Sequence, residues 1–203
     1  MNIKEIYVLN RALDGEDIVF LPSFTKLNMS ELTISAVKDG LISRDWLKSY
    51  NEFTEDGFRI TDYIRRYKEA NKHVKLDNLY IGLHDDGDAI CIIYNPLFEE
   101  YAVDVFDGSM GATQIIESYA FVSEQSGADE HRKEELEYAV LAGMFRLDSE
   151  NSFTFCSSSA ETVTEELYFW ADGQLYVYDF VEGTLSAISK QDILSSLNER
   201  MKV

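Results

Sequence analysis

Residues 78–95, NLYIGLHDDGDAICIIYN, contain two short apolar runs joined by Asp86-Gly87. An Asp-Gly pair between two β-forming runs is a strong signal for a tight hairpin turn. A third run, EEYAVDVF at 99–106, follows the connection NPLF at 95–98. The three runs predict an antiparallel β-meander, and this meander decides the fold class.

A second stretch, ELYFWADGQLYVYDF at 166–180, repeats the order of strand, Asp-Gly and strand. A further apolar run at 185–189 completes a second meander, and SFTFC at 152–156 predicts a strand before it. The repeat favours an internal duplication with halves at 1–123 and 132–203. We expect one compact α+β unit in which two similar helix–meander–helix halves lie about a pseudo-two-fold axis. Their antiparallel sheets would be covered by helices on one face.

Helical patterns surround the meanders. The first half carries an additional helical insert at about 28–72, and the polar run SEQSGADEH at 123–131 is the best candidate for a linker. The other predicted elements are a strand at 17–21 and helices at 3–13, 30–40, 43–50, 54–70, 111–122, 133–147 and 190–201.

The chain of 203 residues carries a net charge of −19, and the excess acids are concentrated in its strand-rich parts. Residues 76–131 and 147–189 contain no Lys or Arg and hold 20 acids, whereas the other 104 residues have a net charge of +1. Affinity for nucleic acid depends on neutralising phosphates, and acids near a duplex oppose it. The charge distribution therefore argues against a nucleic-acid-binding protein.

The most basic stretch, residues 59–75, lies mainly in the helix predicted after the N-cap Thr54. Asp62 with Arg66, and Arg65 with Glu69, have the four-residue spacing of helical ion pairs. We therefore interpret this segment as an ion-paired surface helix rather than a DNA-reading one. Its predicted apolar stripe consists of Phe58, Ile60, Tyr63, Ile64 and Tyr67.

The sequence contains no apolar run long enough to span a membrane, and acids within its first twenty residues argue against a signal peptide. Cys91 and Cys156 each lie in an apolar strand-like run. Such cysteines are mostly buried free thiols, although a disulfide between them is the alternative. These features favour a reduced, cytoplasmic protein.

We find no motif for catalysis, cofactor binding or metal binding. GSMGAT at 108–113 lacks the lysine of a P-loop, and His73, His84 and His131 lie in unrelated segments without metal-ligand spacing. The acids around Gly87 lack the ligand spacing of a calcium loop. We therefore expect a non-enzymatic protein without cofactors, with an unrecognised acidic pair as the alternative.

Two regions are instead candidates for contact with a protein partner. The first is the connection of Pro96, Leu97 and Phe98, which places apolar residues in a loop that we expect at the surface. The second is the 166–180 hairpin, whose aromatic residues fall on both faces of its strands. Burial under helices is the alternative for this hairpin. The candidate residues of the hairpin are Tyr168, Trp170, Tyr176 and Tyr178.

The order of elements in the first half, including the T-x-x-G-F motif at Thr54–Phe58 before the meander, resembles the EspG family, and so does the second helix–meander–helix half. EspG proteins are cytosolic specificity chaperones of ESX (type VII) secretion. The chain resembles most closely the shorter proteins of Firmicute ESX loci. The resemblance implies a quasi-two-fold pair of α+β halves that holds a helical secreted client at an apolar tip.

Three functions are consistent with the sequence. We expect a non-enzymatic cytoplasmic chaperone that resembles EspG and binds a small helical type VII secretion substrate. The alternative is an immunity or inhibitor protein whose acidic sheet caps a basic toxin. A hydrolase with an unrecognised pair of carboxylates is the third.

Overall fold

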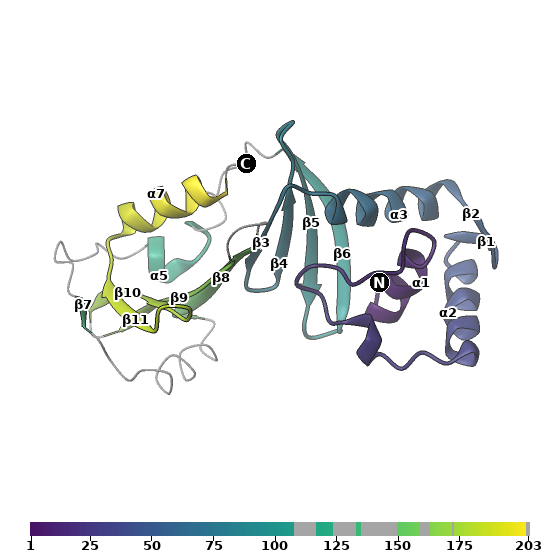
Figure 1. The fold of residues 1–203 in the computed structure, drawn as a ribbon, viewed down its shortest axis with the longest axis horizontal. Coiled ribbons are helices and arrows are strands. Elements are labelled where there is room, and N and C mark those ends of the chain that lie inside the picture. Colours follow the sequence, from purple (N-terminus) through teal and green to yellow (C-terminus); the bar gives the residue numbers. More distant parts are fainter. Residues whose placement is uncertain (108–116, 124–132, 135–149, 159–162, 172, 202–203) are drawn as a thin grey trace. The chain divides into compact units, whose positions relative to one another are not determined.

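The computed structural model describes residues 1–203 except 108–116, 124–132, 135–149, 159–162, 172 and 202–203. The chain divides into two compact units. The first unit comprises Met1–Ala70, Asn78–Gly82 and Ala89–Phe106. The second unit comprises Asn71–Asp77, Leu83–Asp88 and Asp107–Val203. The fold is α+β with predominantly antiparallel strands, as predicted (Figure 1).

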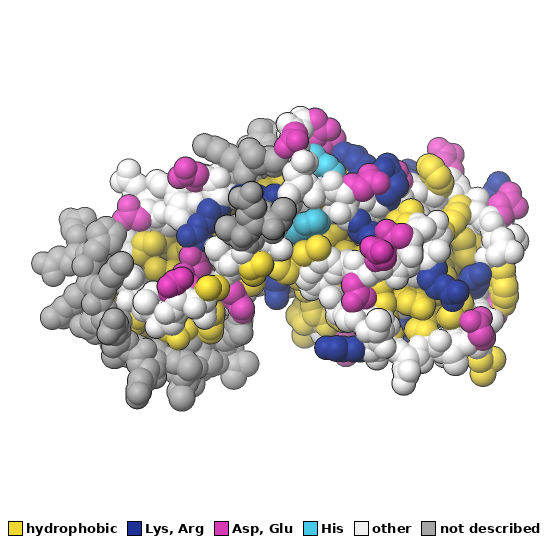
Figure 2. All heavy atoms as spheres, in the orientation of Figure 1, with side chains coloured by type: hydrophobic (Ala, Val, Ile, Leu, Met, Phe, Trp, Pro, Cys, Tyr) yellow, Lys and Arg dark blue, Asp and Glu magenta, His cyan; other side chains and the backbone are white. Residues whose placement is uncertain are grey.

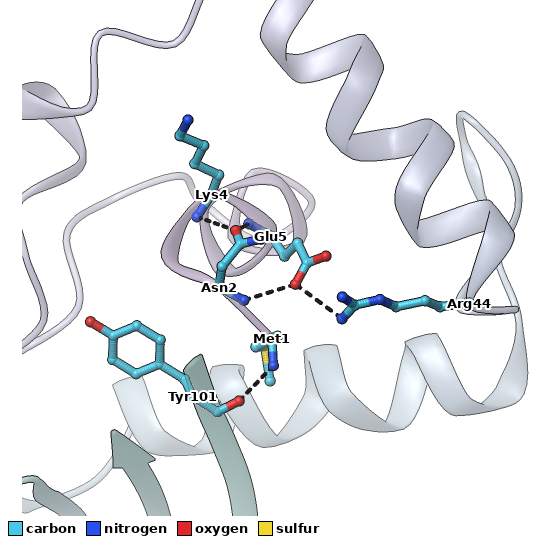
Figure 3. Close-up of polar contacts among 6 residues, drawn as sticks. All are labelled: Met1, Asn2, Lys4, Glu5, Arg44 and Tyr101. Atoms are coloured by element: carbon cyan, nitrogen blue, oxygen red, sulfur yellow. Dashed lines mark hydrogen bonds and ion pairs between the residues drawn. The ribbon is translucent and has the colours of Figure 1, made fainter. Parts of the chain in front are cut away.

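The sheet of the first unit is the predicted meander. Its strands, neighbouring in the order β6-β5-β4, are β4 (Leu79–Leu83), β5 (Asp88–Asn95) and β6 (Glu100–Asp107). Gly87 in the β4–β5 turn has φ +89°, a conformation that glycine adopts without strain. At β6, the end strand of this sheet, the Met1 ammonium donates to the Tyr101 carbonyl at 2.8 Å (Figure 3).

Helix α1 (Ile3–Asn10) begins at a capping box. The Asn2 side chain accepts from the backbone N–H groups of Lys4 and Glu5, and the Glu5 carboxylate accepts from the Asn2 N–H at 2.8 Å (Figure 3). The same carboxylate lies 3.3 Å from the Arg44 guanidinium, just after the end of α2. One buried acid therefore fixes the start of α1 and connects it to α2.

Helix α2 (Glu31–Ser43) is capped by Ser30, and helix α3 (Glu55–Lys68) is capped by Thr54, as predicted. A short 3-10 helix, η1 (Phe24–Lys26), precedes α2. These helices and β4–β6 enclose one core. Its largest fully buried side chains include Ile6, Leu9, Leu41, Ile64, Tyr67, Ile90 and Ile92.

A small hairpin, β1 (Leu47–Ser49) and β2 (Glu52–Phe53), lies between α2 and α3. The Thr54 hydroxyl donates to the Asp45 carbonyl at 2.6 Å and accepts from the Gly57 N–H. A Cβ atom at Gly57 would lie 1.8 Å from the Trp46 carbonyl oxygen. The T-x-x-G pattern is thus explained: threonine caps α3, and glycine lets the helix approach the backbone before β1.

The second unit contains five further antiparallel strands besides β3 (Lys72–Leu76). They are β7 (Lys133–Glu134), β8 (Ser152–Ser158), β9 (Val163–Ala171), β10 (Gln174–Asp179) and β11 (Thr184–Ala187), and the strand order is β3-β8-β9-β10-β11-β7. Helices α5 (Ala120–Ser123) and α7 (Lys190–Arg200) lie on one side of β8–β11 (Figure 1). Helices on one face are therefore observed for this sheet.

Several predicted elements of the first unit were wrong. Residues 17–21 contain a turn and no strand. Ser43 ends α2, and residues 44–50 form turns and β1 rather than a third helix. Asp45 has φ +60°, which cannot continue a helix. Helix α2 runs through Asp39-Gly40 instead of ending there. Phe58, assigned to the apolar stripe of α3, is 66% exposed.

In the second unit, β8 extends through Ser157 and Ser158, beyond the strand predicted at 152–156. The first two residues of the helix predicted at 133–147 form β7 instead. Residues 135–147 lie outside the described residues, as do the linker residues 124–131 and the first half, 111–116, of the helix predicted at 111–122. The halves at 1–123 and 132–203 and their pseudo-two-fold relation stay predictions.

Candidate protein-binding site

The connection between β5 and β6 places a pair of apolar side chains in solvent. Leu97 is 87% exposed and Phe98 is 72% exposed, and Pro96 beside them is also exposed. The Asn95 side chain accepts from the Leu97 N–H at 3.1 Å, which fixes the start of the turn. We call Pro96, Leu97 and Phe98 the apolar tip. A fixed turn that exposes two adjacent large apolar groups is suited to burial by a partner.

Two of the candidate aromatic residues of the second unit are buried. Tyr168 is 1% exposed and Tyr178 is 7% exposed. Tyr168 stacks on Phe153 with ring centroids 4.9 Å apart, and its hydroxyl donates to Glu166 at 2.7 Å. Neither side chain is accessible to a partner in this fold, so the alternative of burial holds for both.

A partly buried charge pair explains how the Tyr168 hydroxyl is accommodated. The Glu166 carboxylate also accepts from the Arg200 guanidinium of α7 at 2.5 Å, and that guanidinium lies 5.7 Å from the centre of the Phe155 ring. Burial, followed by the neighbouring Glu166 charge, raises the pKa of Tyr168 well above its usual value. The cluster joins α7 to β9 and is structural in its geometry.

The other two candidates of the hairpin are half-buried and lie on opposite faces of the sheet. In the β9–β10 register, Trp170 is opposite Leu175, and Tyr176 is opposite Phe169. Because adjacent residues of a strand alternate faces, Trp170 lies on the face of Tyr168 and Tyr176 on the other. They do not form one contact surface, and the structure brings together only Pro96, Leu97 and Phe98.

Helix α3 has the predicted character of an ion-paired surface helix. Arg59 lies 2.7 Å from Asp56, and Arg65 lies 2.7 Å from Asp62 and 2.5 Å from Glu69. Cationic and anionic side chains accordingly lie next to one another over α3 (Figure 2). The pairing leaves little positive potential for binding phosphates.

Sequence reasoning missed a groove in the first unit. It has a volume of about 360 Å³ and is lined by α1, α2 and the β1–β2 hairpin, through Val8, Leu9, Arg11, Ala12, Glu31, Ile34, Lys38, Leu47, Tyr50, Asn51 and Phe53. Its wall contains Leu47 and Tyr50, which the sequence pattern had placed in a helix. The signal that could have indicated a hairpin was the Tyr50-Asn51 turn between short runs.

Both cysteines are buried and free, as expected. Burial raises the pKa of the Cys91 thiol to about 12. Within the described residues, no group of three His, Cys, Asp or Glu side chains is arranged to hold a metal ion. Among the helices that the structure describes, none is long and apolar enough to cross a bilayer.

Comparison with curated proteins found no match. The model of one protein family matches residues 1–203, and its description is "Domain of unknown function (DUF5081)". Since the match spans the whole sequence, the chain belongs to the DUF5081 family.

Proposed function

We propose that the chain is a non-enzymatic, cytoplasmic protein-binding protein that holds a helical secretion substrate through its apolar tip, in the manner of an EspG-type chaperone. The observation that carries the proposal is the exposure of Leu97 and Phe98 side by side in one turn. The resemblance of the order of elements to the EspG family supplies the class of client.

A partner would gain binding free energy by covering the apolar tip. Covering a large apolar side chain contributes about 1.5–3 kcal/mol relative to leaving it in water. The turn is already formed between two paired strands, so little conformational entropy would be lost on binding. Helical clients with an exposed apolar end offer a complementary surface, and shielding that end would keep the client soluble.

The net charge supports the same proposal by limiting self-association. The first unit has 10 Lys and Arg against 15 Asp and Glu, and the second unit has 8 against 22. Like charges on separate copies repel, so a copy with an exposed tip is less prone to bury it against another copy. A client with a basic segment would be attracted over a longer range.

The test is affinity capture of the tagged full chain from its native cytosol, washed at about 0.5 M salt, which reduces the Debye length to a few ångströms. The variants compared are Leu97→Ser with Phe98→Ser, and the matched control Val181→Ser, which changes an exposed apolar residue of the second unit. We expect mass spectrometry to identify a small helical secreted substrate with the natural chain and the control but not with the tip variant. Equal recovery with all three would contradict the proposal.

The acidic second unit favours one other candidate function, an inhibitor that covers a basic toxin. This unit carries a net charge of −14. An inhibitor held by charge would lose its partner as salt rises, whereas a partner held at the apolar tip would stay bound. A basic toxin that is recovered only in low-salt washes, and equally with the tip variant, would support the inhibitor.

A further inference from the structure

We propose that the groove between α1, α2 and the β1–β2 hairpin is a second binding site, which takes an acidic–apolar peptide segment of a partner protein. We call it the α1–α2 groove, with the lining residues given above. The inference rests on the proposed function only in taking the partner to be a protein. It does not depend on the apolar tip, which shares none of the lining residues.

The floor of the groove is apolar. Val8 and Leu9 come from α1, Ile34 from α2, and Leu47 and Phe53 from the hairpin. The volume of about 360 Å³ lies at the lower end of the range for small binding pockets. A space of this size accommodates one or two apolar side chains rather than a whole helix.

Two cations on the groove lack a carboxylate partner, whereas five of the ten cations of the first unit have one. Arg44, Lys48, Arg59, Arg65 and Lys68 all pair with a carboxylate. Within the described residues, by contrast, neither Arg11 nor Lys38 forms an ion pair. Arg11 is also exposed. An anionic ligand in the groove would therefore give both side chains a carboxylate partner.

Lys38 also holds the wall of the groove in place. Its ammonium donates to the Tyr50 carbonyl at 2.9 Å and lies 5.5 Å from the centre of the Tyr50 ring. The Tyr50 hydroxyl donates to Asp39 at 2.6 Å. These contacts of Tyr50 fix the hairpin to α2. The close approach of Gly57 to the Trp46 backbone fixes the start of the hairpin to α3. The groove exists before a ligand binds, which reduces the entropy cost of binding.

The charges define the occupant. The lining contains two cations and one acid, Glu31, in a chain whose net charge is −19. An apolar side chain would bind the floor, and a carboxylate next to it in the same peptide would face Arg11 and Lys38. Glu31 would oppose that carboxylate, so the groove predicts opposite effects of removing Arg11 and removing Glu31.

The experiment titrates the ¹⁵N-labelled full chain with two acetylated and amidated peptides, Leu-Leu-Glu-Leu-Leu and its Gln counterpart, and follows amide chemical shifts. We expect shifts in the groove residues, including Leu47 and Phe53. The Glu peptide should bind about two- to fivefold more tightly than the Gln peptide at low salt, as expected for one exposed charge pair. Arg11→Gln should reduce this difference, because only Lys38 then remains to face the carboxylate, and Glu31→Gln should strengthen binding of the Glu peptide.

Three results would overturn the inference. The first is that neither peptide shifts the amide signals of the groove residues at millimolar concentration. The second is that both peptides bind equally and neither variant changes their binding. The third is that decanoate shifts the groove signals but neither peptide does. The last result would assign the groove to a small amphiphile. The variant with Leu97→Ser and Phe98→Ser should bind the Glu peptide normally. A negative result for peptide binding in the groove can therefore be told apart from a negative result for partner binding at the apolar tip.

Discussion

The β5–β6 and β9–β10 hairpins are both rich in large apolar residues, but these residues are exposed in the first hairpin and mostly buried in the second. In β9–β10 the aromatic residues lie within the strands, and Tyr168 and Tyr178 are buried. In β5–β6 the apolar pair Leu97 and Phe98 lies in the connection and is exposed. Position relative to the strand, rather than aromatic density, therefore distinguishes the buried apolar residues from the exposed ones.

The physical reason is that a paired strand has two faces, and each face can be covered by another layer of the fold. In the second unit one face of β9 carries Tyr168 against Phe153, and the other carries Leu167 and Phe169 in a separate cluster. A turn has no such layers, and it stays at the surface unless another segment crosses it. Apolar residues in turns are thus the better indicator of exposed apolar surface.

The largest effect on the free energy of unfolding is expected at Tyr168. Tyr168→Ala should lower the free energy of unfolding by about 3–5 kcal/mol, because it leaves a cavity beside Phe153. Tyr168→Phe keeps the ring and should cost only about 1 kcal/mol, since Glu166 retains Arg200. Denaturant unfolding measures both. An alanine variant as stable as the phenylalanine variant would show that the ring is not a core residue.

A smaller but substantial effect is expected at the third hairpin, β1–β2. Gly57→Ala brings a methyl group into the space of the Trp46 carbonyl and should cost about 1–3 kcal/mol. Gly40→Ala is the matched control, because Gly40 also lies in a helix but a Cβ there meets nothing within 4 Å. It should be neutral or slightly stabilising. Equal effects of the two substitutions on unfolding would refute the close approach.

The Cys91 thiol tests whether the middle of β5 is buried. Its folded pKa is about 12 against an ordinary value of 9.0. Above pH 9 the unfolded chain would release a proton that the folded chain keeps, so Cys91 should make stability fall as pH rises from 9 towards 12. At pH 8 a thiol reagent should react slowly with the native chain and rapidly in denaturant. Rapid reaction of Cys91 in the native chain would contradict its burial.

Local chemistry made much of the fold predictable. The Asp86-Gly87 turn, the Thr54 cap and seven of the strands (β4–β6 and β8–β11) follow from short-range signals, and the apolar tip follows from two large apolar residues in a connection. The β1–β2 hairpin was missed because its position depends on Gly57, which is distant from Trp46 along the chain. The groove was missed because residues from α1, α2 and the hairpin meet only in the folded chain.

Substitutions at the tip should have the smallest effect on stability and the largest on binding. Leu97→Ser with Phe98→Ser should change the free energy of unfolding by less than about 0.5 kcal/mol per site, because neither side chain is packed. Thermal or denaturant unfolding checks this expectation. A loss of several kcal/mol would mean that the tip belongs to the core of the first unit.

The most direct test of the tip as a contact surface is calorimetric titration of the purified captured partner with the natural chain, the tip variant and Val181→Ser at about 0.1 and 0.5 M salt. We predict that the tip variant weakens binding by about 30-fold or more at both salt concentrations, as for residues that dominate an interface. Val181→Ser should bind as the natural chain does. An unchanged affinity for the tip variant, combined with a steep loss of affinity at high salt, would contradict the account and favour an acidic inhibitor.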